Sequence, residues 1–189
     1  MKGFNVMKRI WRNEHGVAAL EFGVALPFLL LLFLGGVEFT RYIQLHQRLD
    51  KTNNQIADIL SQAPNLTEAD IAGVLSTVPN LLQPYDSDTT SHIVSLAVRD
   101  DADPAYIADR YSEGSGAGSR IGSLGGQLSI DGFTMEEGDE ALIVETYYFY
   151  QPLLGPLLEE LNFDVGNEEE GLYKRAVYRP RTGPIEDFD

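Results

Sequence analysis

The pattern of hydrophobic and polar positions divides the chain into a long apolar segment near its start and a mixed remainder. Residues 17–39 are almost continuously apolar, and only two of these 23 residues, Glu21 and Glu38, are ionisable. At about 1.5 Å per residue, a helix over this segment is roughly 35 Å long, which is enough to cross a bilayer. The pattern therefore predicts a membrane-spanning helix.

Helical periodicity continues beyond this apolar segment. Apolar residues recur at steps of mostly three and four, and no Pro or Gly interrupts residues 37–63. We therefore expect a single transmembrane and extended N-terminal helix over residues 17–62, with its weakest point at the polar run 50–54. Pro27 predicts a bend in this helix, because proline removes one backbone hydrogen bond and crowds the preceding turn.

A second, shorter helix is predicted after this long one. Thr67 is followed by Glu68, Ala69 and Asp70, a sequence typical of a helix N-cap, and apolar residues then recur on one side. Pro79 is expected to end this helix, since proline is poorly tolerated in a helix interior.

The pattern then changes to the alternation that is typical of strands. Three segments are candidate strands and a fourth is a weaker one: residues 92–99, 141–150, 172–178 and, weaker, 127–133. Residues 112–127 contain six glycines and few apolar groups, which predicts a mobile loop. We expect an α+β fold in which a small antiparallel sheet packs on the outer half of the long helix, within one domain over residues 63–189.

An aromatic run, residues 147–150, lies in one of the predicted strands. Successive side chains of a strand point to opposite faces, so either Tyr147 and Phe149 or Tyr148 and Tyr150 must face away from the core. That outer pair is either covered by another element, for which residues 153–161 are a candidate, or forms a docking surface for other subunits.

The charges that flank the apolar segment predict its orientation. Four basic residues precede it against one acid: Lys2, Lys8, Arg9 and Arg12 against Glu14. The positive-inside rule places residues 1–15 in the cytoplasm and the residues after Thr40 on the other side of the membrane. A cleaved secretory signal is the alternative, but no Ala-x-Ala cleavage site follows the apolar segment.

Composition excludes several classes of function. The chain has no cysteine, so disulfides and cysteine-based metal or catalytic sites are excluded, and its net charge of −15 argues against binding nucleic acid. The three histidines are scattered, and we expect no metal site, no cofactor and no enzyme activity. The acidic clusters 86–88, 100–103 and 168–170 lack the calcium-loop pattern, and we interpret them as solvated surface.

Two acidic residues in the apolar segment are candidate functional residues. A charge near the centre of a bilayer costs about 2.5 to 3.5 kcal/mol, so Glu21 needs a partner or a function. If the chain is cut after Gly16, the new ammonium group of Val17 could pair with Glu21 of the same helix or of a neighbouring one. Glu38 lies three residues before Arg41, a spacing that favours an ion pair on one helix face, with a subunit contact as the alternative.

These features resemble a known family. The residues that carry the resemblance are the basic stub, Gly16, the Glu21-Phe22 pair, the core Leu-Pro-Phe-Leu-Leu-Leu-Leu and the sequence Gly-Val-Glu-Phe-Thr-Arg over residues 36–41. Together they resemble TadE-like pseudopilins of the tight-adherence (Flp) pilus system. The resemblance is specific over residues 12–48, and residues 144–154 and 177–181 look like the family's outer domain more loosely.

The resemblance implies a function and a set of partners. It makes residues 1–16 a cytoplasmic leader that a prepilin peptidase removes at the Gly16–Val17 bond, and it assigns Glu21 and Phe22 to subunit assembly. Its implied partners are other pilins or pseudopilins, an inner-membrane assembly platform and the lipid bilayer. The main hypothesis is a minor pseudopilin of a Tad-type pilus, in a TadE-like or TadF-like role, with its C-terminal domain in the periplasm. The alternatives are an unprocessed, membrane-anchored periplasmic scaffold or adaptor and, less favoured, a tethered hydrolase.

Overall fold

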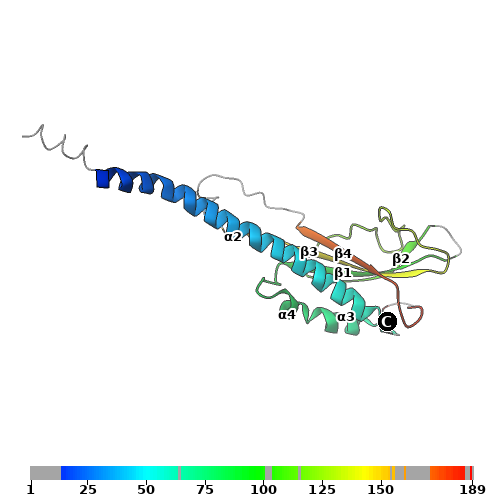
Figure 1. The fold of residues 1–189 in the computed structure, drawn as a ribbon. Coiled ribbons are helices and arrows are strands. Elements are labelled where there is room, and N and C mark those ends of the chain that lie inside the picture. The colour runs from blue at the N-terminus through cyan, green and yellow to red at the C-terminus, as the bar shows by residue number, and fades with distance from the viewer. Residues whose placement is uncertain are drawn as a thin grey trace, which may run out of the picture.

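The computed structural model describes residues 14–63, 65–100, 104–114, 116–153, 155, 160, 171–185 and 188. Its main feature is one long helix, α2 (Glu14–Leu60), whose N-terminal part projects away from a small α+β domain. The C-terminal part of α2 lies along a four-stranded sheet, and two short helices lie beside it (Figure 1). This architecture confirms the predicted α+β fold and the sheet packed on the outer half of the helix.

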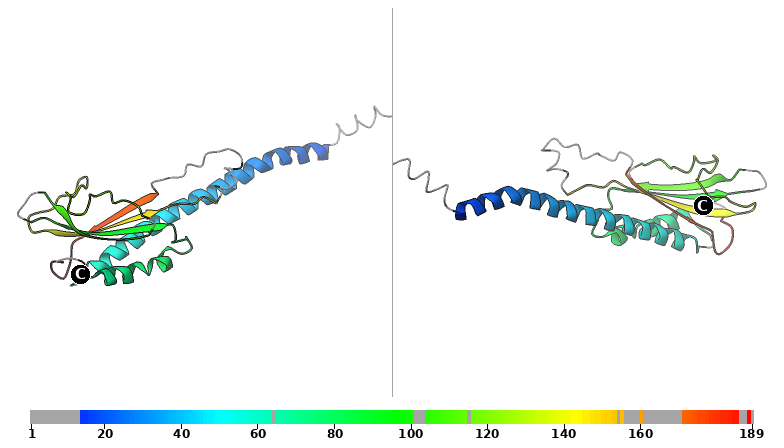
Figure 2. Two further views of the ribbon diagram at one scale, coloured as in Figure 1. Left: turned by 180° about the vertical axis from the view of Figure 1, so that it is seen from behind. Right: turned by 45° about the horizontal axis from the view of Figure 1, so that its top comes forward.

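Helix α2 runs without interruption through Pro27, where the sequence predicts a bend, and through residues 50–54, where it predicts a weak point. It continues through Pro27, and the two views of Figure 2 show a gentle curve along its projecting part. The prediction of a weak point at residues 50–54 is wrong, because Thr52 and Asn53 are buried in the domain. The polar run belongs partly to the interior, where the sheet holds it.

The predicted N-cap of the second helix is confirmed. Helix α3 (Glu68–Leu75) begins with a capping box in which Thr67 accepts a hydrogen bond from the Asp70 amide and the Asp70 carboxylate accepts one from the Thr67 amide. The role predicted for Pro79 is wrong. It does not end a helix but lies in the first turn of a separate short helix, α4 (Val78–Leu82), where its missing N–H costs nothing.

The sheet contains four antiparallel strands in the order β2-β1-β3-β4. The strands are β1 (Thr90–Val98), β2 (Tyr106–Gly114), β3 (Glu140–Tyr148) and β4 (Leu172–Tyr178), and β1, β3 and β4 confirm the three stronger candidates. The weaker candidate at residues 127–133 is wrong, since Gln127 makes only an isolated bridge to Tyr106. Strand β2 was not predicted. It is an edge strand of mostly polar residues, and a register shift opposite Leu96 and Ala97 breaks its alternation.

Each face of the sheet is covered by a different part of the chain. The helical side carries the larger core, in which apolar residues of α2, α3 and α4 pack on β1 and β3. The opposite side carries a smaller core around Ile107, Ile121 and Met135. Because both faces are covered, the central strands β1 and β3 are buried along nearly their whole length.

The expectation of an unfolded glycine-rich loop is wrong for the described part of residues 112–127. Ile121 in this loop is fully buried, and the amide of Gly125 donates to the carbonyl of Ile107 over 2.8 Å. Gly122 has a φ of +132°, and a Cβ there would lie 2.5 Å from the carbonyl oxygen of Gln127. Glycine is therefore required at this position because the loop backbone packs closely on itself.

A buried carboxylate anchors this loop to the sheet. Glu145 of β3 is fully buried, and its oxygens accept hydrogen bonds from the hydroxyl of Ser119 (2.5 Å), the amide of Arg120 (3.0 Å) and the hydroxyl of Tyr173 (2.9 Å). The same face of the sheet carries Tyr147, one of the aromatic residues 147–150. Tyr147 lies under the loop and donates to the carbonyl of Gly118 over 2.7 Å, so the loop covers this face of the sheet.

Candidate membrane-anchoring and assembly site

The N-terminal part of α2 has the properties of a membrane anchor. Its apolar side chains face outward with no protein covering them, and they include Leu20, Phe22, Val24, Phe28, Leu32 and Phe33. By length and composition this helix can cross a bilayer, and it is the one such helix in the described part of the chain. A chain with one exposed, apolar N-terminal helix and a separate packed domain fits a single-pass membrane anchor.

Glu21 lies in this exposed part of the helix, one turn after Val17. Both Glu21 and its neighbour Phe22 are exposed, and within the described residues no hydrogen bond or ion pair involves Glu21. Gly16 and Val17 lie in the first turns of α2, which begins at Glu14, and the basic residues 2–12 lie outside the described residues. Among the described residues, the Glu21 carboxylate therefore has no partner.

Glu38, at the other end of the apolar segment, joins the helix to the sheet domain. One of its carboxylate oxygens accepts a hydrogen bond from the hydroxyl of Tyr150, and the other accepts one from the amide of Leu153 over 3.1 Å. These contacts take the place of the ion pair expected between Glu38 and Arg41, which the structure does not form. The chain that follows β3 is thus held against α2 at the point where the apolar segment ends.

Aromatic residues surround this junction. The rings of Tyr42 and Tyr150 meet edge to face with their centroids 5.5 Å apart, and the hydroxyl of Tyr85 donates to the carbonyl of Arg41 over 3.0 Å. Burial, together with the hydrogen bond to Glu38, raises the pKa of the Tyr150 hydroxyl well above its ordinary value of 10. Tyr150 is therefore protonated at neutral pH and can donate to Glu38.

A second polar contact joins α2 to the sheet deeper in the domain. The Asn53 side chain donates to the carbonyl of Val144 over 3.1 Å and accepts from the hydroxyl of Thr146 over 2.9 Å. Thr146 in turn lies 3.0 Å from Nδ1 of His92. Because the proton of the Thr146 hydroxyl is already given to Asn53, Nδ1 of His92 must be the donor in this contact, which leaves Nε2 without a proton.

The environment of His92 favours its neutral form. The ring is almost completely buried, and burial lowers the pKa of His92 to about 4. Nε2 is a buried atom without a hydrogen-bond partner among the described residues, and His92 lines a small cavity whose other lining residues include Asp88 and Glu113.

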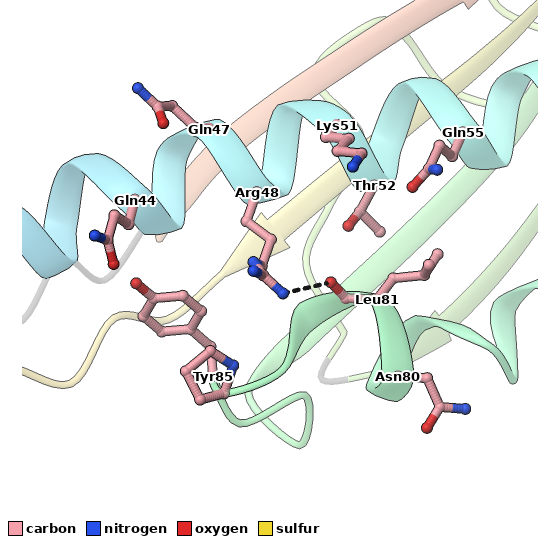
Figure 3. Close-up of a pocket in the computed structure, with 10 residues that line it drawn as sticks. Gln44, Gln47, Arg48, Lys51, Thr52, Gln55, Asn80, Leu81 and Tyr85 are labelled. Atoms are coloured by element: carbon pink, nitrogen blue, oxygen red, sulfur yellow. Dashed lines mark hydrogen bonds between the residues drawn. The ribbon is translucent and has the colours of Figure 1, made fainter.

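A polar groove of about 470 Å³ runs between α2 and α4 (Figure 3). The cations in its lining are Arg48 and Lys51, accompanied by the amide side chains of Gln44, Gln55 and Asn80. Arg48 extends across the groove and donates to the carbonyls of Leu81 and Gln83, so it ties the end of α4 to the long helix. This groove is therefore part of the contact between α2 and α4.

The described residues contain no group of three or more His, Cys, Asp or Glu side chains that could hold a metal ion. Of the acidic clusters considered for calcium, residues 101–103 and 168–170 lie outside the described residues, while Asp86 uses one carboxylate oxygen to accept from the amide of Asp88.

Sequence reasoning singled out Glu38 but not its partners. The polar run 50–54 contained the signal for Asn53, since an asparagine in a helix pattern that faces a core needs a buried hydrogen-bond partner. No sequence signal pointed to Tyr150 or Leu153 as the residues that reach Glu38, because 112 and 115 positions separate them from it.

Fold and exposed helix together fit a single-pass, membrane-anchored α+β protein, and one comparison with known proteins matches part of the chain to a family model. Residues 16–57 match the family model described as TadE-like protein. The match begins at Gly16 and covers the apolar segment and most of the domain-facing half of α2. It confirms the resemblance noted for these residues and is consistent with a TadE-like protein of the Tad pilus system. Neither the search of curated proteins nor that of solved structures gave a match.

Proposed function

We propose that this protein is a minor pseudopilin that takes part in assembling a Tad-type pilus and has no enzymatic role. In this proposal a prepilin peptidase cuts the chain after Gly16 on the cytoplasmic side of the bacterial inner membrane, and the sheet domain lies in the periplasm. The mature helix then packs with other pilin-like subunits and with an inner-membrane assembly platform.

The observation that carries this proposal is the isolated position of Glu21. Its carboxylate lies on an uncovered helix in a segment suited to lipid, and no partner for it lies within the described chain. Cleavage after Gly16 creates an ammonium group on Val17, one helical turn away in the same chain and equally available from a neighbour. An ion pair between two subunits relieves the cost of the charge in the bilayer and sets the register of the two helices.

One observation favours the alternative, an unprocessed single-pass scaffold or adaptor. Helix α2 begins at Glu14 and runs through the Gly16–Val17 bond without a break. A peptidase must unwind this part of the helix before it can reach the bond.

Intact-mass measurement of the membrane-extracted chain separates the two functions. We expect co-expression with an active prepilin peptidase to produce a chain that starts at Val17, and co-expression with an inactive peptidase to leave residues 1–16 in place. Gly16→Leu is expected to block cleavage, and Gly23→Leu is the matched control, because both glycines lie in α2 with open space around a new Cβ. A full-length chain in the presence of the active enzyme would support the scaffold and contradict the pseudopilin.

A second measurement tests the role of Glu21. Glu21→Val is expected to leave membrane insertion intact but to reduce recovery of other pilus subunits with the extracted protein. Leu20→Val, at the adjacent exposed position, controls for the change in side-chain shape. Equal recovery from both variants would contradict the assembly role of Glu21.

A further inference from the structure

We propose that Leu153 forms a second contact with the lipid bilayer, beside the point where helix α2 leaves the membrane. The inference rests on the membrane anchoring of α2 in the proposed function and adds a contact made by the sheet domain itself.

The position of Leu153 follows from its contact with Glu38. The Leu153 amide donates to the Glu38 carboxylate over 3.1 Å, so Leu153 lies at the same level along the helix as Glu38. A hydrocarbon core of about 30 Å is spanned by about 20 helical residues, and a span that starts at Val17 therefore ends within a turn of Glu38. This places Leu153 at the boundary between hydrocarbon and headgroups.

The Leu153 side chain faces outward at this level. It is 60% exposed, and the helix residues on either side of Glu38, Val37 and Phe39, are 37% and 66% exposed. The apolar surface of the anchor and that of Leu153 thus occur at one height. In the sequence, Leu153 is followed by Leu154, Leu157 and Leu158, so a leucine-rich stretch begins at this point.

The junction with α2 fixes Leu153 in this place. The Tyr150 hydroxyl donates to the second oxygen of Glu38, and the Tyr150 ring packs on Tyr42 of the helix. Tyrosine rings are common at the level of the headgroups, because one end is apolar and the other forms hydrogen bonds. The chain that carries Leu153 therefore has a defined height relative to the anchor.

Charge makes an apolar contact the favourable way for this domain to meet lipid. The net charge of the chain is −15, so its acidic surface is repelled by anionic headgroups. A leucine that enters the boundary region gains from leaving water and needs no electrostatic attraction. Two contacts with the membrane, the helix and Leu153, restrict the rotation of the domain about the helix axis, which a single helix leaves free.

Site-directed fluorescence in vesicles tests this contact, and the absence of native cysteine makes each label unique. Three single-cysteine variants of the full chain compare side chains of similar exposure: Leu153→Cys (60%), Leu124→Cys in the glycine-rich loop (58%) and Leu31→Cys within the anchor (52%). Each variant is labelled with a polarity-sensitive dye and placed in phosphatidylcholine vesicles that carry a spin label either near the glycerol or at the middle of the acyl chain.

We expect the label at residue 153 to be quenched several-fold more than that at residue 124, and most strongly by the spin label near the glycerol. The label at residue 31 should respond most to the spin label in the middle of the chain. If residue 31 is quenched while residue 153 behaves like residue 124, the second contact is wrong and the anchor stands. If residue 31 is not quenched either, the membrane anchor itself fails and the inference fails with it.

Discussion

Acidification should destabilise the sheet domain through one buried histidine. His92 lies between the sheet and the small cavity near α3, donates from Nδ1 to Thr146, and is kept neutral by burial. The ordinary pKa of histidine is 6.5, and burial lowers that of His92 to about 4. Between these two values the unfolded chain binds a proton that the folded chain does not bind.

The magnitude and the sign follow from this difference. Each pH unit between the two pKa values corresponds to about 1.4 kcal/mol, so His92 accounts for a loss of about 3 kcal/mol. The folding stability that depends on neutral His92 is fully present above pH 6.5. It is lost as the pH falls to about 4 and does not change further below that value. A loss of this size is a large fraction of the 5 to 15 kcal/mol by which domains are typically stable.

Urea unfolding of the full chain in detergent micelles, followed by circular dichroism at several pH values, measures this loss. His92→Asn is the matched variant, because the asparagine amide can replace Nδ1 as the donor to Thr146 without titrating. Asp88 and Glu113, which line the cavity beside His92, are present in both proteins, so the difference between the two pH profiles isolates the histidine. Parallel profiles from pH 7 to pH 4 would refute the reasoning.

Three further predictions concern stability, each measured by urea unfolding at neutral pH. Glu145→Ala should lower the free energy of unfolding by about 3 kcal/mol, because it leaves three donors without their acceptor. Glu145→Gln retains an acceptor oxygen and should lower it less. Equal losses would contradict the anchoring role. Asn53→Ala should cost about 2 kcal/mol, since the Val144 carbonyl and the Thr146 hydroxyl lose their buried partner, and a loss below about 0.5 kcal/mol would contradict this. Thr67→Ala should cost about 1 kcal/mol, and Thr77→Ala less, because the Thr77 side chain does not cap its helix; the reverse order would be incompatible with the cap.

The elements with strong local signals were predictable from the sequence. The apolar run predicted the exposed part of α2, the Thr67 cap predicted the start of α3, and alternation predicted β1, β3 and β4. These signals are local because hydrogen bonds within a helix and the alternation of a buried strand depend on neighbouring residues. Glu21 was predictable for the same reason, since a charge in an apolar run is visible without knowledge of the fold.

The errors arose where distant parts of the chain decide the structure. Strand β2 is polar and lies at an edge, so the sheet holds it by backbone hydrogen bonds that its side chains do not reveal. The glycine-rich loop appeared too polar to fold, yet Ile121 has a place in the smaller core and Glu145 provides acceptors for the loop. Pairing with Glu145 stabilises a loop that has little local tendency to fold.

By itself, the sequence determined that the chain has a helix suited to lipid, an acidic residue inside it, and a small α+β domain without cysteine. Only the tertiary structure decided that Glu38 binds Tyr150 and Leu153 instead of Arg41, and that Asn53 is a buried partner of the sheet. The physical reason is the range of the interactions. Helix and strand formation depend on residues close in sequence, whereas a buried polar group takes whichever partner the packed chain brings within hydrogen-bond distance.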